Sequence, residues 1–180
     1  MPQTTLAGHP VHPQLVAFPI GLLPFSFVLD VMHTVTRKES YAEAAFYTMV
    51  GGCVGGLAAG ATGAADYLTI PPDSHSKKTA NLHALLNLAV MGLYGINLFL
   101  RRGRKPPTGF LPKLLSLAGT AGLIISSWYG GELVYELGMR VKPLMEGEQG
   151  PEWKLPHDRE LEQGFRNFEE RYAPSGGPQD

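Results

Sequence analysis

Two histidines stand between two prolines in residues 8–13 (GHPVHP), directly before a long apolar run. A residue that precedes proline is pushed out of the helical region, so we expect His9 and His12 to lie on an extended segment. Pro13 suits the first turn of the helix that follows, because its missing N–H would have no partner there. Two imidazoles held in this way concentrate nitrogen ligands at one place, and their chemistry depends on what else reaches it.

Other polar side chains that can act as ligands stand at the ends of further apolar runs. Asp66 lies near the end of the second run, and Glu132 lies near the end of the fourth. His83 opens the third run, and Asn87 follows one helical turn later on the same face. Ionisable groups inside apolar spans are costly and usually face a bundle interior, where they are paired or functional. We therefore treat these residues, together with His12, as one candidate site.

Three chemical interpretations of this candidate site stay open. A low-spin b-type haem would use His12 and His83 as axial ligands, with Asn87 beside them. An iron, copper or zinc ion would instead draw on imidazole and carboxylate ligands, namely His9, His12, His83, Asp66 and Glu132. In the third interpretation the two carboxylates accept hydrogen bonds from the imidazoles, and the cluster is a structural cap without any ligand.

Four apolar runs must position these residues, over residues 15–35, 42–68, 82–100 and 111–137. A helix needs about 20 apolar residues to cross a bilayer, and helix is the state available to such runs outside a closed barrel. The connections are short, so neighbouring helices are antiparallel and the sequence predicts an all-α, up-down four-helix membrane bundle. The alternating direction brings the candidate site residues to the same end of this bundle.

The rest of the chain flanks the predicted bundle. Residues 1–14 form an N-terminal segment, residues 15–140 the four-helix domain, and residues 141–180 a short polar tail. Within the tail, residues 158–172 have the charge spacing of a short amphipathic helix.

Glycine is frequent in the second run, with small residues four apart along residues 51–63. Such spacing lets helix backbones approach closely. It would also suit a flat cofactor lying against the glycine face, and the sequence does not separate these two interpretations.

The distribution of basic residues predicts how the bundle is oriented. The connections after the first and third runs carry Arg37, Lys38 and the cluster at residues 101–105. The opposite end carries fewer basic residues, among them Lys77 and Lys78. Loops rich in Lys and Arg stay in the cytoplasm. We therefore expect a multi-pass protein of the bacterial inner membrane, with both termini and the candidate site on the periplasmic side.

Two polar residues of the first run lie far from the candidate site. Asp30 and His33 fall at the predicted cytoplasmic end. We interpret them as an interfacial pair, and a second ligand site at that end stays open.

Composition excludes several classes of function. The net charge is −1 and there is no basic stripe with interleaved aromatic residues, which argues against binding of nucleic acid. The single cysteine, Cys53, cannot form an intrachain disulfide. No nucleophile–base pair and no phosphate-binding loop is present, so the sequence predicts no catalytic residues.

Four motifs together resemble a known bacterial family. They are H-P-x-H-P at residues 9–13, D-Y at 66–67, H-x-L-x-N at 83–87 and G-G-E-L-V-Y at 130–135. The chain is similar over about residues 8–141 to a membrane family catalogued as domain of unknown function number 2231. The resemblance implies a four-helix inner-membrane protein. Some members are fused to a Rieske iron–sulfur domain, which implies electron transfer. This chain lacks the Cys/His signatures of a Rieske centre, so such a partner would be a separate protein.

These observations favour two functions. The first is a membrane redox protein that holds haem or a redox metal through His12 and His83 and exchanges electrons with a quinone or with a periplasmic iron–sulfur or cytochrome partner. The second is a structural or accessory subunit of a larger membrane complex, in which the polar cluster is a hydrogen-bonded cap.

Overall fold

The computed structural model describes residues 5–6, 9–103 and 109–139. The chain divides into two units, Met1–Lys142 and Pro143–Asp180, and everything described below belongs to the first. The elements are β1 (Thr5–Leu6), β2 (His9–Pro10), α1 (Val11–Thr36), α2 (Glu39–Tyr67), α3 (His75–Arg101) and α4 (Phe110–Tyr135). The polar tail, with its expected helix over residues 158–172, lies outside the described residues.

The two short strands immediately precede the first helix. β1 pairs with β2 in antiparallel register, with Thr5 opposite Pro10 and Leu6 opposite His9. The backbone at His9 is therefore extended, as expected for a residue that precedes proline.

Helix α1 begins at Val11, earlier than the predicted start at residue 15, and the expectation of an extended His12 is wrong. Pro10 is the N-cap, with an extended backbone, and Pro13 lies in the first helical turn as predicted. The first N–H groups of a helix have no intrahelical partner, so a proline there removes no hydrogen bond. The helix can therefore include the histidine that precedes Pro13.

Helix α3 also begins earlier than its apolar run, at His75 instead of residue 82. Ser74 is the N-cap, and its side-chain oxygen accepts a hydrogen bond from the backbone N–H of Lys77 at 3.1 Å. A serine cap satisfies one of the free N–H groups at the helix start, so the polar first turns of α3 are helical despite their low hydropathy.

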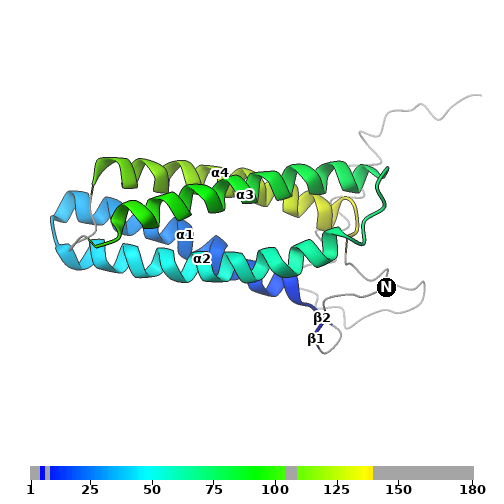
Figure 1. Cartoon of the computed structure of the whole chain (residues 1–180), viewed down its shortest axis with the longest axis horizontal. Helices are drawn as coiled ribbons and strands as arrows, with labels where there is room; N and C mark the ends of the chain where they lie inside the picture. Colours follow the sequence, from blue (N-terminus) through cyan, green and yellow to red (C-terminus); the bar gives the residue numbers. More distant parts are fainter. Residues whose placement is uncertain (1–4, 7–8, 104–108, 140–180) are drawn as a thin grey trace, which may run out of the picture. The chain divides into compact units, whose positions relative to one another are not determined.

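The four helices lie side by side, and each runs opposite to the one before it (Figure 1). Helix α1 packs against α2 and α4, and helix α3 packs against α4 and α2. Each helix is long and apolar enough to cross a membrane, as predicted. Large apolar side chains such as Leu57, Leu88 and Ile124 are exposed on the outer faces. A helix that is apolar on its outer as well as its inner face suits a lipid surrounding.

The interior between the helices is narrow and depends on glycine. Its core cluster consists of Leu23, Met49, Cys53, Val90, Tyr94 and Leu123. A Cβ atom at Gly52 of α2 would lie 2.5 Å from Leu23 Cδ2, and one at Gly119 of α4 would lie 2.6 Å from Tyr94 Cε2. Any larger residue would force the neighbouring side chain to shift, so close packing of the glycine-rich run is confirmed at Gly52.

Candidate functional site

His12 is fixed against helix α2 by one hydrogen bond and one close contact. Its Nδ1 donates to the backbone carbonyl of Ala59 at 2.7 Å. A carbonyl oxygen can only accept, so the proton of the neutral ring is on Nδ1 and the lone pair is on Nε2. The ring lies over Gly63, where a Cβ atom would be 2.8 Å from His12 Cε1. A glycine is therefore needed beneath the imidazole.

His83 is fixed against helix α4 in the same manner. Its Nδ1 donates to the backbone carbonyl of Ser126 at 2.9 Å, and the ring lies over Gly130, where a Cβ atom would be 2.9 Å from His83 Cε1. The lone pair is again on Nε2, and it accepts a hydrogen bond from Asn87 Nδ2 at 3.0 Å. Asn87 thus lies directly beside the candidate nitrogen ligand.

The two imidazoles lie at the same end of the helices. Both rings are partly buried, His12 in the first turn of α1 and His83 in the third turn of α3. The structure thus brings together two residues that the sequence placed at one end of the bundle. Each ring is held by its Nδ1 to a backbone carbonyl, the arrangement that orients histidine ligands in metal sites.

Two acidic residues of the candidate site lie near the C-terminal ends of α2 and α4. Glu132 Oε1 lies 4.0 Å from Nε2 of His75, at the start of α3. Asp66 lies in the last turn of α2, where its backbone carbonyl accepts a hydrogen bond from Thr69 Oγ1 at 2.7 Å. The side chain of His9 lies outside the described part of the chain. Among the described residues, no three His, Cys, Asp or Glu side chains are grouped so as to hold a metal ion.

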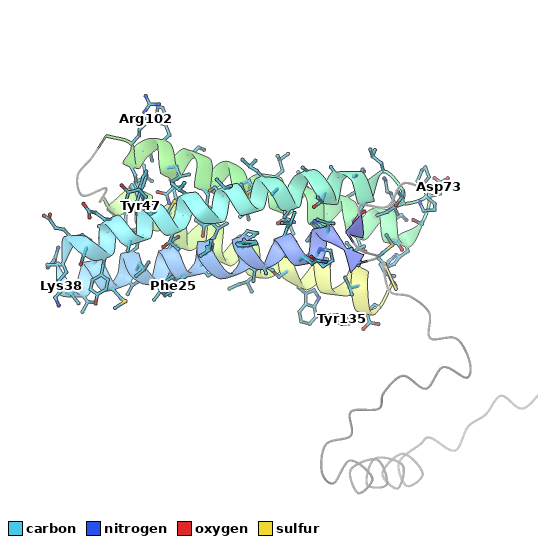
Figure 2. All side chains as sticks on the ribbon, turned by 90° about the horizontal axis from the view of Figure 1, so that it is seen from below. Phe25, Lys38, Tyr47, Asp73, Arg102 and Tyr135 are labelled. Atoms are coloured by element: carbon cyan, nitrogen blue, oxygen red, sulfur yellow. The ribbon has the colours of Figure 1, made fainter. Side chains whose placement is uncertain are left out.

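The two ends of the helices carry different side chains. Figure 2 shows Lys38 and Arg102 at one end and Asp73 and Tyr135 at the other. The two imidazoles belong to the end with Asp73, because α1 and α3 begin there.

A buried ion pair at the opposite end was not predicted. Arg101 donates from Nη1 to Asp30 Oδ1 at 2.8 Å and from Nη2 to Asp30 Oδ2 at 2.6 Å. The two side chains are 0% and 2% exposed. Ser116 Oγ donates to Asp30 Oδ2 at 3.0 Å, and Arg101 Nε donates to Asn97 Oδ1 at 2.8 Å. Every charged atom of this cluster therefore has a partner.

The expected interfacial pair of Asp30 with His33 is wrong. Asp30 faces the interior, where a carboxylate needs a cation and several donors, and the planar guanidinium of Arg101 supplies both. His33 instead lies beside Lys113, with 3.4 Å between Nδ1 and Nζ, and Lys113 also donates to Thr34 Oγ1 at 2.8 Å. Arg101 is not a loop charge, as its place after the third apolar run suggests, but the buried last residue of α3.

One sequence signal points to this pair. An aspartate inside an apolar run implies a partner in the bundle interior. Arg101 directly follows the third apolar run on the same side, but Arg37 and Arg102 lie close to that end as well, so the sequence limits the partner to a few arginines.

The glycines beneath the imidazoles give a direct test of the site geometry. Gly63→Ala and Gly130→Ala are each expected to destabilise the protein by about 1–3 kcal/mol, because the added methyl group would overlap the ring. Gly60→Ala on the same helix α2 is the matched control, since nothing lies within 4 Å of a Cβ there. Thermal unfolding in detergent measures all three. Equal stability of the Gly60 and Gly63 variants would contradict the described position of His12.

A family described as "Predicted membrane protein (DUF2231)" matches residues 8–143. The chain belongs to this family. The match confirms the resemblance drawn from the four motifs, and with the four long apolar helices it makes the chain a multi-pass membrane protein. No curated protein and no solved structure matches the chain. The family therefore supplies the membrane setting, and any function must be argued from the site.

Proposed function

We propose that the chain is a membrane redox protein that holds a b-type haem, or alternatively a redox metal, between His12 and His83. One observation carries the proposal: both imidazoles donate Nδ1–H to a backbone carbonyl of the adjacent helix, at 2.7 and 2.9 Å. This fixes the tautomer of each ring with its lone pair on Nε2, the state that binds a metal. Two imidazoles fixed in this state at the same end of the helices, each over a glycine, would supply a pair of nitrogen ligands.

Haem suits this pair better than a bare metal ion. Metal ions in proteins take four or more ligands, and no group of three suitable side chains occurs among the described residues. An iron porphyrin brings four nitrogens of its own and would need only two imidazoles from the protein, which His12 and His83 would supply. When bound, it would supply one-electron transfer at a potential set by the ligands and by burial. The chain itself would orient the rings through Ala59 and Ser126 and exclude water with apolar helix faces.

Asn87 has a defined part in this proposal. Its amide donates both to His83 Nε2 and to the His83 backbone carbonyl, each at 3.0 Å. If Nε2 were to bind a metal, the first of these bonds would be lost and the second could remain. Asn87 would then help to hold His83 in place through the backbone carbonyl.

The proposed topology is an up-down bundle with the imidazole end at the periplasmic face of a bacterial inner membrane. Arg101 does not contribute to the loop charges that orient the helices, because its guanidinium is buried against Asp30. Arg37, Lys38 and Arg102 remain at the end opposite the imidazoles, and such residues favour the cytoplasm. The redox site then lies within reach of a quinone in the bilayer or of a periplasmic iron–sulfur or cytochrome partner.

The second candidate function is a structural or accessory subunit of a membrane complex. The bond from Asn87 to His83 Nε2 favours it, because this bond already satisfies the lone pair of one imidazole. Glu132 and His75 also lie near each other at this end of the helices, with 4.0 Å between Oε1 and Nε2. In this account the histidines join neighbouring helices and bind no cofactor.

The absorption spectrum and metal content of the purified protein distinguish the two functions. Cells replete in haem and metals should yield protein with a Soret band and about one iron per chain, as one pair of axial ligands binds one haem. Stoichiometric copper or non-haem iron without a Soret band would support the alternative metal. A colourless, metal-free protein that is folded and helical would reject the redox function and leave the structural one.

A further inference from the structure

The two helical hairpins, α1–α2 and α3–α4, make the same contacts at matching positions. His12 bonds to Ala59 and lies over Gly63, and His83 bonds to Ser126 and lies over Gly130. The residue over Gly52 is Leu23, and the residue over Gly119 is Tyr94. The contacting pairs are His12–Gly63 and Leu23–Gly52 in the first hairpin, and His83–Gly130 and Tyr94–Gly119 in the second. Gly55 of the first hairpin lies against Phe18 and, less closely, against Pro19, and Gly122 of the second lies against Val90, the counterpart of Pro19.

These matches follow one constant offset in each pair of helices. Every α3 residue named lies 71 positions after its α1 counterpart, the separation of Asp30 from Arg101. Three of the six glycines of α2 have counterparts in α4 with unchanged spacing, at residues 52, 55 and 63 and at residues 119, 122 and 130. Buried side chains of α1 and α3 follow the same offset: Pro19, Leu23, Ser26 and Asp30 match Val90, Tyr94, Asn97 and Arg101. A coincidence of single contacts would not preserve all of these spacings.

Matching residues also touch one another across the interior. Tyr94 Oη lies 3.4 Å from the backbone carbonyl of Leu23, and Arg101 binds Asp30. When two copies of one unit are related by a twofold axis, a residue near the axis contacts the equivalent residue of the other copy. Here the two units are the two hairpins. Because α1 and α3 run in the same direction (Figure 1), this axis lies along the helices, as in parallel internal repeats of membrane proteins.

We propose that the four helices are two copies of one hairpin, and that the Asp30–Arg101 pair selects the pairing of unlike hairpins. If two first hairpins paired, Asp30 would face a second Asp30 in the interior, and two second hairpins would likewise oppose two guanidinium groups. A buried charge without its partner is strongly destabilising, and repulsion of this kind is how interfaces reject the wrong partner. Equivalent positions that are both apolar, such as Leu29 and Leu100, do not distinguish the pairing of like hairpins from that of unlike hairpins.

The inner face of the first hairpin is therefore an interaction surface for an arginine-bearing hairpin. In a single chain that partner is α3–α4, and between two chains it would be the α3–α4 hairpin of a second copy. This inference is independent of any cofactor, because it rests on contacts along the whole length of the helices and on a pair at the end opposite the imidazoles.

Variants of the full-length protein in which one charge is reversed, or the two charges are exchanged, test whether the Asp30–Arg101 pair selects the pairing of unlike hairpins. Asp30→Arg places two cations together, and Arg101→Asp places two anions together. Each is expected to lower the midpoint of thermal unfolding in detergent by about 10 °C or more. The exchanged variant, Asp30→Arg with Arg101→Asp, should recover more than half of that loss, because matching positions face each other across the axis. The exposed Glu43→Arg is the control and should leave the midpoint unchanged.

The exchanged variant keeps the test decisive if the single variants do not fold. Folded, helical protein from the exchanged variant alone would support the proposal. An exchanged variant no more stable than the worse single variant would overturn it.

A second measurement addresses partner choice directly. In the variant Asp30→Leu with Arg101→Leu the charges are gone, so hairpins of two copies can pair without penalty. Two differently tagged copies of this variant, expressed together, should co-purify several-fold more than two tagged native copies, counted in the monodisperse fraction. Equal co-purification of variant and native chains would show that the ion pair does not select the partner, and would overturn the proposal.

Discussion

Replacement of Arg101 by methionine is expected to lower the free energy of unfolding by about 3–5 kcal/mol. The guanidinium is 0% exposed, and it gives Asp30 two hydrogen bonds and an opposite charge. Without it the carboxylate stays buried with only the hydroxyl of Ser116 as a donor. Methionine keeps most of the volume of the side chain, so the loss measures the missing charge more than a cavity.

Two further variants make this prediction specific. Arg102→Met changes a neighbouring exposed arginine at the same end, and it should cost well under about 1 kcal/mol. Asp30→Leu with Arg101→Met removes both charges and should return stability to near the native value, since apolar replacement of a whole buried pair is often neutral. Equilibrium unfolding in mixed detergent measures all of them. A loss for Arg101→Met no larger than for Arg102→Met would contradict the buried pair.

The second large effect concerns the cofactor. If His12 and His83 are the axial ligands, His12→Ala and His83→Ala should each reduce bound haem at least about tenfold, since even indirect partners of a metal ligand change affinity by 10–100-fold. Both variants should remain helical, because most of the contacts between the helices do not involve these rings. The ratio of Soret absorbance to protein, with circular dichroism as the measure of folding, gives the result.

His33→Ala is the matched control for this experiment. It removes the same side chain from the same helix α1, but at the end where Lys113 lies. The control should retain full haem content. Loss of haem from His33→Ala, or its retention by both ligand variants, would place the cofactor elsewhere.

The spans could be predicted from the sequence because they depend on local composition. Length and hydropathy identify four helices, and short connections make neighbours antiparallel. Together these features predict that His12 and His83 lie at the same end of the bundle. The helix starts were less predictable: Pro13 permits helix at His12, and Ser74 caps polar turns of α3 that carry no hydropathy signal.

The partners of the polar residues could not be predicted, because they depend on which helix faces turn inward. Asp30 is three residues from His33 in sequence, yet it meets Arg101 on a different helix. Glu132 lies near His75, with 4.0 Å between Oε1 and Nε2, a contact that the sequence does not specify. The repeat is not visible in the sequence, because equivalent positions of the two hairpins carry different residue types. Leu23 is equivalent to Tyr94, and Asp30 is equivalent to Arg101.

The most direct test of the central claim is the low-temperature electron paramagnetic resonance spectrum of the oxidised, purified protein. If the imidazoles of His12 and His83 bind one iron, the spectrum will show a low-spin ferric signal of the bis-imidazole type, and removing either histidine will abolish it. A high-spin signal, or folded protein with no bound iron at all, would contradict the claim.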